Sequence, residues 1–319
     1  MVQGGRSTVP GAGERQAADG RGAATGSESN GQERRPGLHH RSIARRRASD
    51  LMVKVLSAVS SLIVLFFLGW ILFEVASRGA GALGLDFFTE LPRPPGMEGG
   101  GLANAILGTL VITVLATLLG VPLGLGAGIY LSEFGLDSRA ATAVRFLSNV
   151  LMGTPSIIIG VFVYTLLVLP AGHFSGYAGA VALAIIMLPV IARTSEDILG
   201  LVPNALRESA LALGAPRWKM TLGIVFRSAR AGLITGGVLA LARISGETAP
   251  LLFTTLNSPY WPESLNQPTA NLTVTIFNYA MSPYADWKAQ AWGASLLIMA
   301  AVLLMAALSR LMFRRKRGR

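Results

Sequence analysis

Two charged side chains lie inside an apolar run that is long enough to cross a membrane. Arg243 and Glu247 occur in the string ALARISGETAPLLFT, four residues apart, so a helix would place them on one face. A charge in the hydrocarbon layer costs about 2.5–3.5 kcal/mol on insertion scales, and such residues usually pair or face a cavity. Two interpretations remain open: a salt bridge that fixes helix packing, or a site that meets a transported ion.

The chemistry of Arg243 favours an anion. Its guanidinium offers several planar N–H donors that suit a tetrahedral oxyanion, and it stays protonated at physiological pH. Glu247 would neutralise the arginine while the path is empty, and an arriving anion would replace the carboxylate. Ser156 follows Pro155 in another apolar run, where the proline frees a backbone carbonyl and the hydroxyl adds a polar group. We therefore expect Arg243, Glu247 and Ser156 along a translocation path.

The composition of the chain is that of a multi-span membrane protein. It has 319 residues, of which 51% are hydrophobic and 14% are charged. A helix needs about 20 residues to cross the hydrocarbon layer. Six stretches meet this length, at residues 55–75, 102–131, 146–169, 179–198, 229–252 and 291–313. Because every backbone polar group must be paired inside lipid, we predict an all-α membrane protein with six transmembrane helices.

The distribution of charge determines the expected orientation. The net charge of +11 could indicate nucleic-acid binding, but the basic residues between the predicted spans cluster on one side. Residues 132–145 and 193–230 hold eight Arg or Lys, whereas residues 78–101, 170–178 and 257–290 hold three. Basic loops stay on the cytoplasmic side of a membrane. We therefore predict a multi-pass plasma-membrane protein with both termini cytoplasmic and with no nucleic-acid partner.

Residues 1–50 differ in composition from the rest of the chain. They are rich in Gly, Ser, Ala and Arg and nearly free of large apolar side chains. Such a segment cannot bury enough surface to offset the entropy of ordering, so we predict a disordered basic cytoplasmic tail before a transmembrane domain at residues 51–319. With no cysteine and three histidines, the sequence predicts no metal site. It also holds no Walker-type phosphate-binding loop, so we place ATP hydrolysis on another chain.

One hydrophilic segment, residues 203–226, lies in the longest predicted cytoplasmic loop. A Pro-Asn pair can start a helix there, and apolar residues then recur at helical spacing among Arg, Lys and Glu. Gly214 interrupts the pattern, and Ala215 and Pro216 follow it, so a chain reversal is expected. The segment predicts a hairpin of two amphipathic helices, which could lie on the membrane surface or dock a protein.

The same segment resembles a known signature. The string ESALALGAPRWKMTLGI resembles the EAA signature of permease subunits from binding-protein-dependent ABC importers. In that family the loop forms a coupling helix that sits in a groove of the cytoplasmic ATPase. The resemblance implies that the ATPase-coupling positions are Glu208, Ser209, Ala210, Gly214 and Ala215. Ser209 replaces the usual alanine, and Arg227 stands where the motif usually ends in proline.

Two further strings resemble the PstA-type permeases of phosphate ABC importers. These are GETAPLLFT, beside Arg243, and TPSIIIG, in the third predicted span. The resemblance extends from about the first predicted span to the C-terminus and implies the MetI-like architecture of ABC importer permeases. It also implies transport roles for Arg243, Glu247, Arg193 and Glu196. For Arg193, a snorkelling position at the cytoplasmic end of a span is an equally good explanation.

The resemblance implies a complete import system around this chain. A second related permease would form the other half of the pathway, a dimeric cytoplasmic ATPase would bind Mg-ATP, and an extracytoplasmic binding protein would deliver phosphate. The chain itself would be the permease subunit of an ATP-driven phosphate importer, carry no cofactor and catalyse no reaction. Three alternatives stay open: a permease for sulfate, molybdate or phosphonate, an ion-coupled secondary transporter, and a membrane sensor or scaffold.

Overall fold

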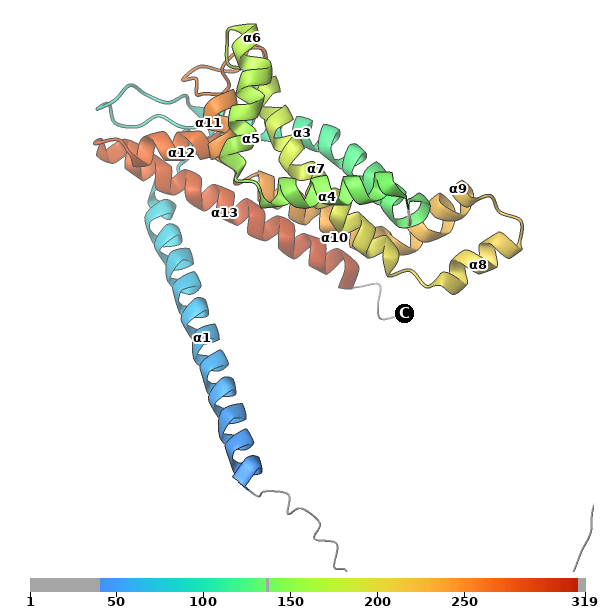
Figure 1. The fold of residues 1–319 in the computed structure, drawn as a ribbon. Helices are drawn as coiled ribbons and strands as arrows, with labels where there is room; N and C mark the ends of the chain where they lie inside the picture. The colour runs from blue at the N-terminus through green and yellow to red at the C-terminus, as the bar shows by residue number, and fades with distance from the viewer. Residues whose placement is uncertain (1–40, 136–137, 315–319) are drawn as a thin grey trace, which may run out of the picture. The chain divides into compact units, whose positions relative to one another are not determined.

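The computed structural model describes residues 41–135 and 138–314, and the regular structure in these ranges is helical (Figure 1). Five helical segments there are long and apolar enough to cross a membrane, at Arg45–Ala82, Ala103–Phe134, Gly176–Gly200, Arg217–Ile244 and Ala285–Leu311. A sixth span is added if the bent pair Arg139–Gly153 and Ser156–Ala171 counts as one. The prediction of an all-α membrane protein is confirmed, with five or six spans.

The chain divides into two compact units, residues 1–62 and residues 63–319. The described part of the first unit is the beginning of helix α1 (Arg41–Gly79). This helix starts inside the predicted tail, because residues 41–50 contain Ala and Arg, which favour helix, and neither Gly nor Pro. The rest of the predicted tail lies outside the described residues.

Two spans pack closely at the centre of the second unit. With the π-helical turn that extends the first of them, they are α3 (Ala103–Ile129), η2 (Tyr130–Phe134) and α7 (Gly176–Gly200). A stripe of Gly120, Gly124 and Gly128 on α3 faces α7, and a methyl group at any of the three would press against α7 atoms. Small residues let helices approach closely in lipid, where van der Waals packing drives association. The most apolar stretch of α7 is accordingly 67% buried, the highest value among the five spans.

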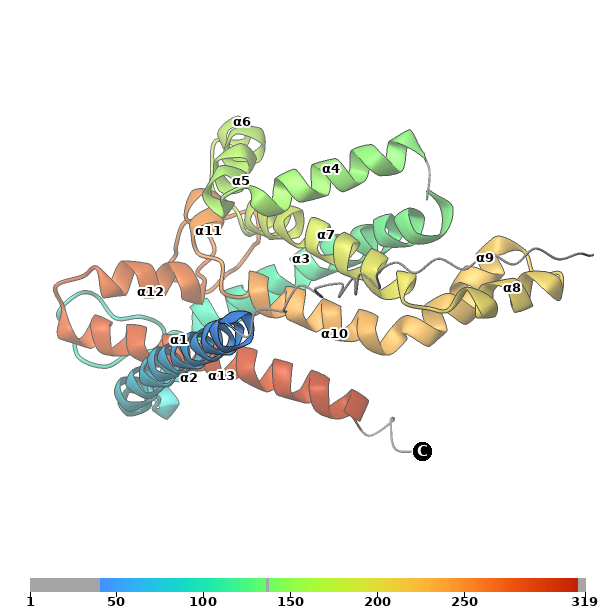
Figure 2. The same cartoon turned by 60° about the horizontal axis from the view of Figure 1, so that its bottom comes forward.

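Two further long helices flank this pair. They are α10 (Phe226–Ile244) and α13 (Ala285–Arg314), and the shorter helix α12 (Leu272–Ala280) packs along α13 (Figure 2). α10 contacts both α7 and α13. Tyr279 of α12 stacks on Trp287 of α13, with ring centroids 4.3 Å apart. These contacts join the central pair, α10, α12 and α13 into one helical body.

The third predicted span, residues 146–169, is not one continuous helix. α4 (Arg139–Gly153) ends before Thr154, and α5 (Ser156–Val163) starts after Pro155 at an angle of 104°. Proline disfavours the helical conformation in the residue before it, and Thr154 is accordingly extended, with ψ of 130°. The expectation of one continuous helix is corrected here, and the range forms a broken span.

The fifth predicted span, residues 229–252, is also interrupted. α10 ends at Ile244, and the short helix α11 (Ala249–Thr254) follows after four residues. Gly246 lies in the interruption, and glycine is a poor helix former. Pro250 cannot donate the backbone hydrogen bond that a continuous helix requires, and it instead occupies the first turn of α11, where no such bond is needed. The prediction of a single helix through residue 252 is therefore wrong.

Short elements connect the spans. The remaining ones in the described chain are η1 (Ala80–Ala82), α2 (Leu85–Thr89), η3 (Tyr164–Val168), α6 (Leu169–Ala171), α8 (Asn204–Ala212), α9 (Arg217–Met220) and η4 (Thr221–Val225). Like η2, the segments η3 and η4 are π-helical turns, in which one extra residue widens the helix. η4 joins α9 directly to α10.

Candidate functional site

The strings GETAPLLFT and TPSIIIG meet in the structure. The first covers the interruption between α10 and α11, and the second covers the bend before α5. α11 lies beside α5 in both views (Figures 1 and 2), and a methyl group at Gly160 of α5 would be 2.6 Å from the Pro250 Cα of α11. Two interrupted helices are thus neighbours. Transporters use such interruptions at substrate sites, because helix ends there expose unpaired backbone groups.

The predicted pairing of Arg243 with Glu247 is not found. Arg243 lies in the last turn of α10 and is exposed, whereas Glu247 lies beyond the end of that helix. The described residues include no ion pair or hydrogen bond between the two side chains. A spacing of four residues places side chains on one face only while the helix continues, and here it stops at Ile244. The Glu247 carbonyl instead accepts a hydrogen bond from the Thr273 hydroxyl at 2.8 Å, which ties the interruption to α12.

Ser156 lies at the bend between α4 and α5. It is the first residue of α5 and is half-buried. α5 contacts α11, so the helix that begins at Ser156 lies beside the helix that follows Glu247. The structure therefore brings the elements that carry these two residues together, and it places Arg243 at the neighbouring end of α10.

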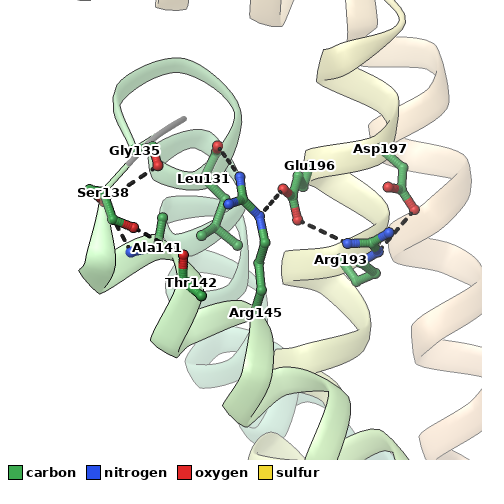
Figure 3. Close-up of polar contacts among 9 residues, drawn as sticks. All are labelled: Leu131, Gly135, Ser138, Ala141, Thr142, Arg145, Arg193, Glu196 and Asp197. Carbon is green, nitrogen blue, oxygen red and sulfur yellow. Dashed lines mark hydrogen bonds and ion pairs between the residues drawn. The ribbon is translucent and has the colours of Figure 1, made fainter.

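Arg193 and Glu196 belong to a charged cluster near the end of α7 (Figure 3). Arg145 Nε, from α4, donates to Glu196 Oε1 at 2.6 Å, and Arg193 Nη1 donates to Glu196 Oε2 at 3.4 Å. Arg193 Nε also lies 3.4 Å from Asp197 Oδ2. The Glu196 side chain is only 14% exposed, so arginines from two helices neutralise an almost buried carboxylate. Arg145 Nη2 further donates to the Leu131 carbonyl at 3.0 Å, which attaches α4 to η2.

The predicted hairpin is formed by α8 and α9. Gly214 connects them with φ of 80°, a left-handed conformation that glycine adopts readily after a helix. Ala210 is buried and Ala215 is half-buried, and the Ala215 amide donates to the Ala210 carbonyl at 3.2 Å. Glu208, Ser209 and Gly214 are exposed. The five predicted coupling residues thus divide into two alanines that pack inward and three residues that face outward.

Large apolar side chains of the hairpin remain exposed. Leu213 is 88% exposed and Trp218 is 57% exposed, and Leu206 and Leu211 are exposed as well. Exposed apolar side chains gathered on one segment are typical of a surface that a partner or lipid covers.

A second buried ion pair, not anticipated from the sequence, holds the hairpin to the spans. Arg207 of α8 donates to both carboxylate oxygens of Glu133 in η2, at 2.7 Å from Nη2 and 3.2 Å from Nε. Nη2 also donates to the Leu199 carbonyl at 2.8 Å, and Nη1 donates to the Val202 carbonyl and to Asn204 Oδ1. These hydrogen bonds match the five N–H donors of a guanidinium. The side chain of Glu133 is 3% exposed and that of Arg207 is 16% exposed.

The sequence contains little that would have revealed these pairs. Arg145 and Arg207 stand out in it only as basic residues of predicted cytoplasmic loops. Arg207 lies 74 residues from Glu133, and a pairing at that separation depends on which helices pack together. The one available signal is a lone glutamate at the end of an apolar run.

A cavity of about 460 Å³ opens beside both ion pairs. Its lining includes Glu133 and Glu196 as well as Arg207, Arg217 and Met220. It therefore lies where η2, α7 and the hairpin meet. Within residues 41–135 and 138–314, no three His, Asp or Glu side chains are grouped so that they could hold a metal ion.

The fold and the hairpin define a class of protein. Residues 120–318 match the family described as binding-protein-dependent transport system inner membrane component. The chain therefore belongs to this family of membrane-embedded transport subunits.

One sequence relative and two solved structures show which members of the family this chain resembles. The phosphate transport system permease protein PstA of Yersinia pestis is 48% identical over 272 residues, which cover 85% of this chain and 92% of the relative. A chain of the inward-facing MetNI methionine ABC transporter has a TM-score of 0.56 at 21% identity and covers 67% of this chain and 95% of that one. A chain of a bacterial alginate ABC transporter, crystallised with a pentasaccharide-bound periplasmic protein, has a TM-score of 0.57 at 16% identity and covers 86% and 98%. The predicted ABC importer permease architecture and the resemblance to PstA-type permeases are confirmed.

Proposed function

We propose that this protein is the PstA-type permease of an ATP-driven phosphate importer and forms half of its translocation pathway. The observation that carries the proposal is the 48% identity to a PstA permease over 92% of that protein's length. The permease holds no cofactor of its own in this proposal, and Mg-ATP is hydrolysed on a separate, dimeric ATPase. A second related permease supplies the other half of the pathway.

The proposed orientation places both termini in the cytoplasm. The α8–α9 hairpin and α12 lie at opposite ends of the second unit in both views (Figures 1 and 2). Arginines and a lysine concentrate on the hairpin and the adjoining segments, and the rule that basic loops stay inside supports a cytoplasmic position for that end. The end that carries α12 then faces the extracytoplasmic phosphate-binding protein.

The ATPase docks on the hairpin in this proposal. Support comes from the outward-facing Glu208 and Ser209 together with the exposed Leu213 and Trp218. An exposed indole near the centre of a contact is typical of residues that dominate binding energy. Gly214 permits the sharp reversal, and Ala210 is buried in a cluster with Leu199 and Val202.

The translocation path in this proposal passes the interrupted helices. Arg243 has no ion-pair or hydrogen-bond partner among the described residues, so its guanidinium is available to an anion. Ser156 and Glu247 provide polar groups at the two interruptions. At the cytoplasmic end, Arg193 holds Glu196 at 3.4 Å, whereas Arg145 holds the same carboxylate at 2.6 Å. Arg193 is therefore the partner that can turn to a passing anion while Glu196 stays neutralised.

Reconstitution tests the proposal. The permease is co-expressed with its candidate partner permease, ATPase and binding protein, and phosphate uptake into vesicles is measured with and without ATP. We expect ATP-dependent uptake that excess sulfate, molybdate or phosphonate does not suppress. Suppression by one of these anions would assign that substrate instead. Uptake without ATP that stops when the proton gradient collapses would favour a secondary transporter, and no flux would favour a sensor or scaffold.

Two pairs of variants test the site. Arg243→Gln should abolish uptake in an assembled complex, and Arg230→Gln, an exposed arginine earlier in the same helix, should not. Glu208→Lys should abolish co-purification of the ATPase, and Glu98→Lys, at an exposed position of another loop, should not. Wild-type uptake in Arg243→Gln would remove that residue from the path. Normal ATPase association in Glu208→Lys would remove the hairpin as the docking site.

A further inference from the structure

Arg207 attaches α8 to the spans through hydrogen bonds. Of the nine residues of α8, only Ala210 is buried. A single alanine methyl gives little apolar contact, and the leucines at positions 206 and 211 are exposed. The hydrogen bonds of the Arg207 guanidinium to Glu133 and Leu199 are therefore the polar connection between this helix and the spans behind it.

Two of the residues that accept from Arg207 belong to the central helix pair, one on each side of it. Glu133 lies in η2, which continues α3, and the Leu199 carbonyl lies in the last turn of α7. The Leu199 carbonyl also accepts from the Val202 amide at 3.1 Å, and a carbonyl oxygen has two lone pairs, so the guanidinium occupies its second acceptor position. α3 and α7 are packed along the stripe from Gly120 to Gly128 and therefore behave as one rigid body. Arg207 is hydrogen-bonded to that body at one end.

The geometry of this contact fixes an orientation as well as a distance. Two parallel N–H···O bonds hold the guanidinium and the carboxylate in one plane, whereas a lysine ammonium would act as a point charge that can swivel. The Glu133 carboxylate is almost fully buried, so water cannot easily replace the arginine. A rotation or translation of α8 is then passed to α3 and α7 and is not lost in a flexible linkage.

We propose that Arg207 and Glu133 form a rigid joint through which displacement of α8 moves α3 and α7. Both are positioning residues, because neither is proposed to touch the anion or the ATPase. The inference rests on the proposed function, in which the ATPase docks on α8. In this inference, the Arg207–Glu133 ion pair is the contact that transmits motion of the ATPase to the helices of the translocation path.

The experiment uses the complete reconstituted complex with Glu133→Gln and Arg207→Lys. Glu74→Gln is the matched control, because it breaks an exposed ion pair with Arg78 on α1. We measure co-purification of the ATPase, the rate of ATP hydrolysis, and the number of phosphates imported per ATP. Both joint variants should keep the ATPase and continue to hydrolyse ATP, while phosphate import per ATP falls about tenfold, within the range typical of coupling between sites. The control should keep the wild-type ratio.

Two outcomes would overturn the joint. One is an unchanged ratio of phosphate to ATP in either joint variant. The other is loss of the ATPase in parallel with transport, because the pair would then shape the docking surface and not transmit motion. If Glu208→Lys fails to release the ATPase, the proposed docking site itself is wrong. If Glu208→Lys releases it while Glu133→Gln keeps full coupling, only the joint is wrong.

A cross-linking experiment distinguishes a loss of coupling from a folding defect. The chain has no cysteine, so a Glu133→Cys/Arg207→Cys double variant carries only the two introduced thiols. Bridging them with short bis-methanethiosulfonate reagents, which join the two thiols through disulfides, should restore phosphate import per ATP, and a reductant should reverse the effect. No restoration at any linker length would contradict the joint. Failure of all three joint variants to assemble would contradict it as well, because the pair would then be required for folding and not for coupling.

Discussion

Replacing Gly128 by alanine tests whether α3 and α7 form one tightly packed body. A methyl group at Gly128 would lie 2.5 Å from Ser195 Cβ and 2.8 Å from the Ala192 carbonyl oxygen, both on α7. Carbon atoms in contact are about 3.5–4.0 Å apart, so the two helices would have to separate by about 1 Å at this point. Gly126 supplies a control in the same helix, since a methyl group there meets nothing within 4 Å.

Two opposing effects determine the expected change in the free energy of unfolding. Alanine favours helix over glycine by about 1 kcal/mol, and at Gly126 this gain has nothing to oppose it. Overpacking at Gly128 costs about 1–3 kcal/mol, which leaves a net loss of up to about 2 kcal/mol after the same gain. The two alanine variants should therefore differ from each other by about 1–3 kcal/mol, with Gly128→Ala the less stable.

Thermal unfolding of the purified complex in detergent, followed by tryptophan fluorescence, measures this difference. Gly126→Ala should match or exceed the wild-type melting temperature, and Gly128→Ala should fall below it. Phosphate import per ATP should also fall in Gly128→Ala alone, because a loosened pair transmits less of the motion of α8. Equal melting temperatures for the two variants would refute the close contact between α3 and α7.

Three further predictions concern the hairpin and the interrupted helices. Trp218→Asp should weaken ATPase association about tenfold or more, because an exposed indole at a docking surface is a typical hot spot. Pull-down titration measures the change, and wild-type affinity would place the contact elsewhere. Arg145→Met should lower the free energy of unfolding by about 1–3 kcal/mol, less than for a fully buried pair, because the Arg145–Glu196 pair is partly exposed. Denaturant titration checks that value, and no loss would mean that Arg193 alone neutralises Glu196. Pro155→Ala should allow α4 and α5 to straighten, so spin labels on the two helices should move apart and uptake should fall; unchanged label distances would show that packing sets the bend.

Much of the architecture could be predicted from local features of the sequence. The spans can be located in the sequence because a run of about 20 consecutive apolar residues is typical of a membrane-spanning helix. The hairpin can be located because Gly214 interrupts a helical pattern in the sequence. In the structure the chain reverses at this glycine, which has a positive φ. Both signals depend on neighbouring residues only, and the structure agrees with both.

The interruptions could not be predicted, because proline acts differently in different surroundings. Gly120-Val121-Pro122 lies within the continuous helix α3, whereas Gly153-Thr154-Pro155 separates α4 from α5. In lipid, neighbouring helices can satisfy the groups that a proline frees, and whether they do so depends on packing. The same dependence hides the pairing of Glu133 with Arg207. Local pattern therefore locates the helices, while tertiary packing decides where they break and what joins them.

The π-helical turn η4 makes the number of residues in Thr221–Val225 important for the direction in which the hairpin points. It lies between the hairpin and α10 without any intervening loop. Deleting one residue from Thr221–Val225 would restore ordinary helical winding and turn everything ahead of it by about 100° around the axis of α10. The proposed ATPase-docking face would then point away from the ATPase even though every side chain on it was intact. Selection at this stretch should act on residue count, so homologous chains should tolerate neither insertion nor deletion there.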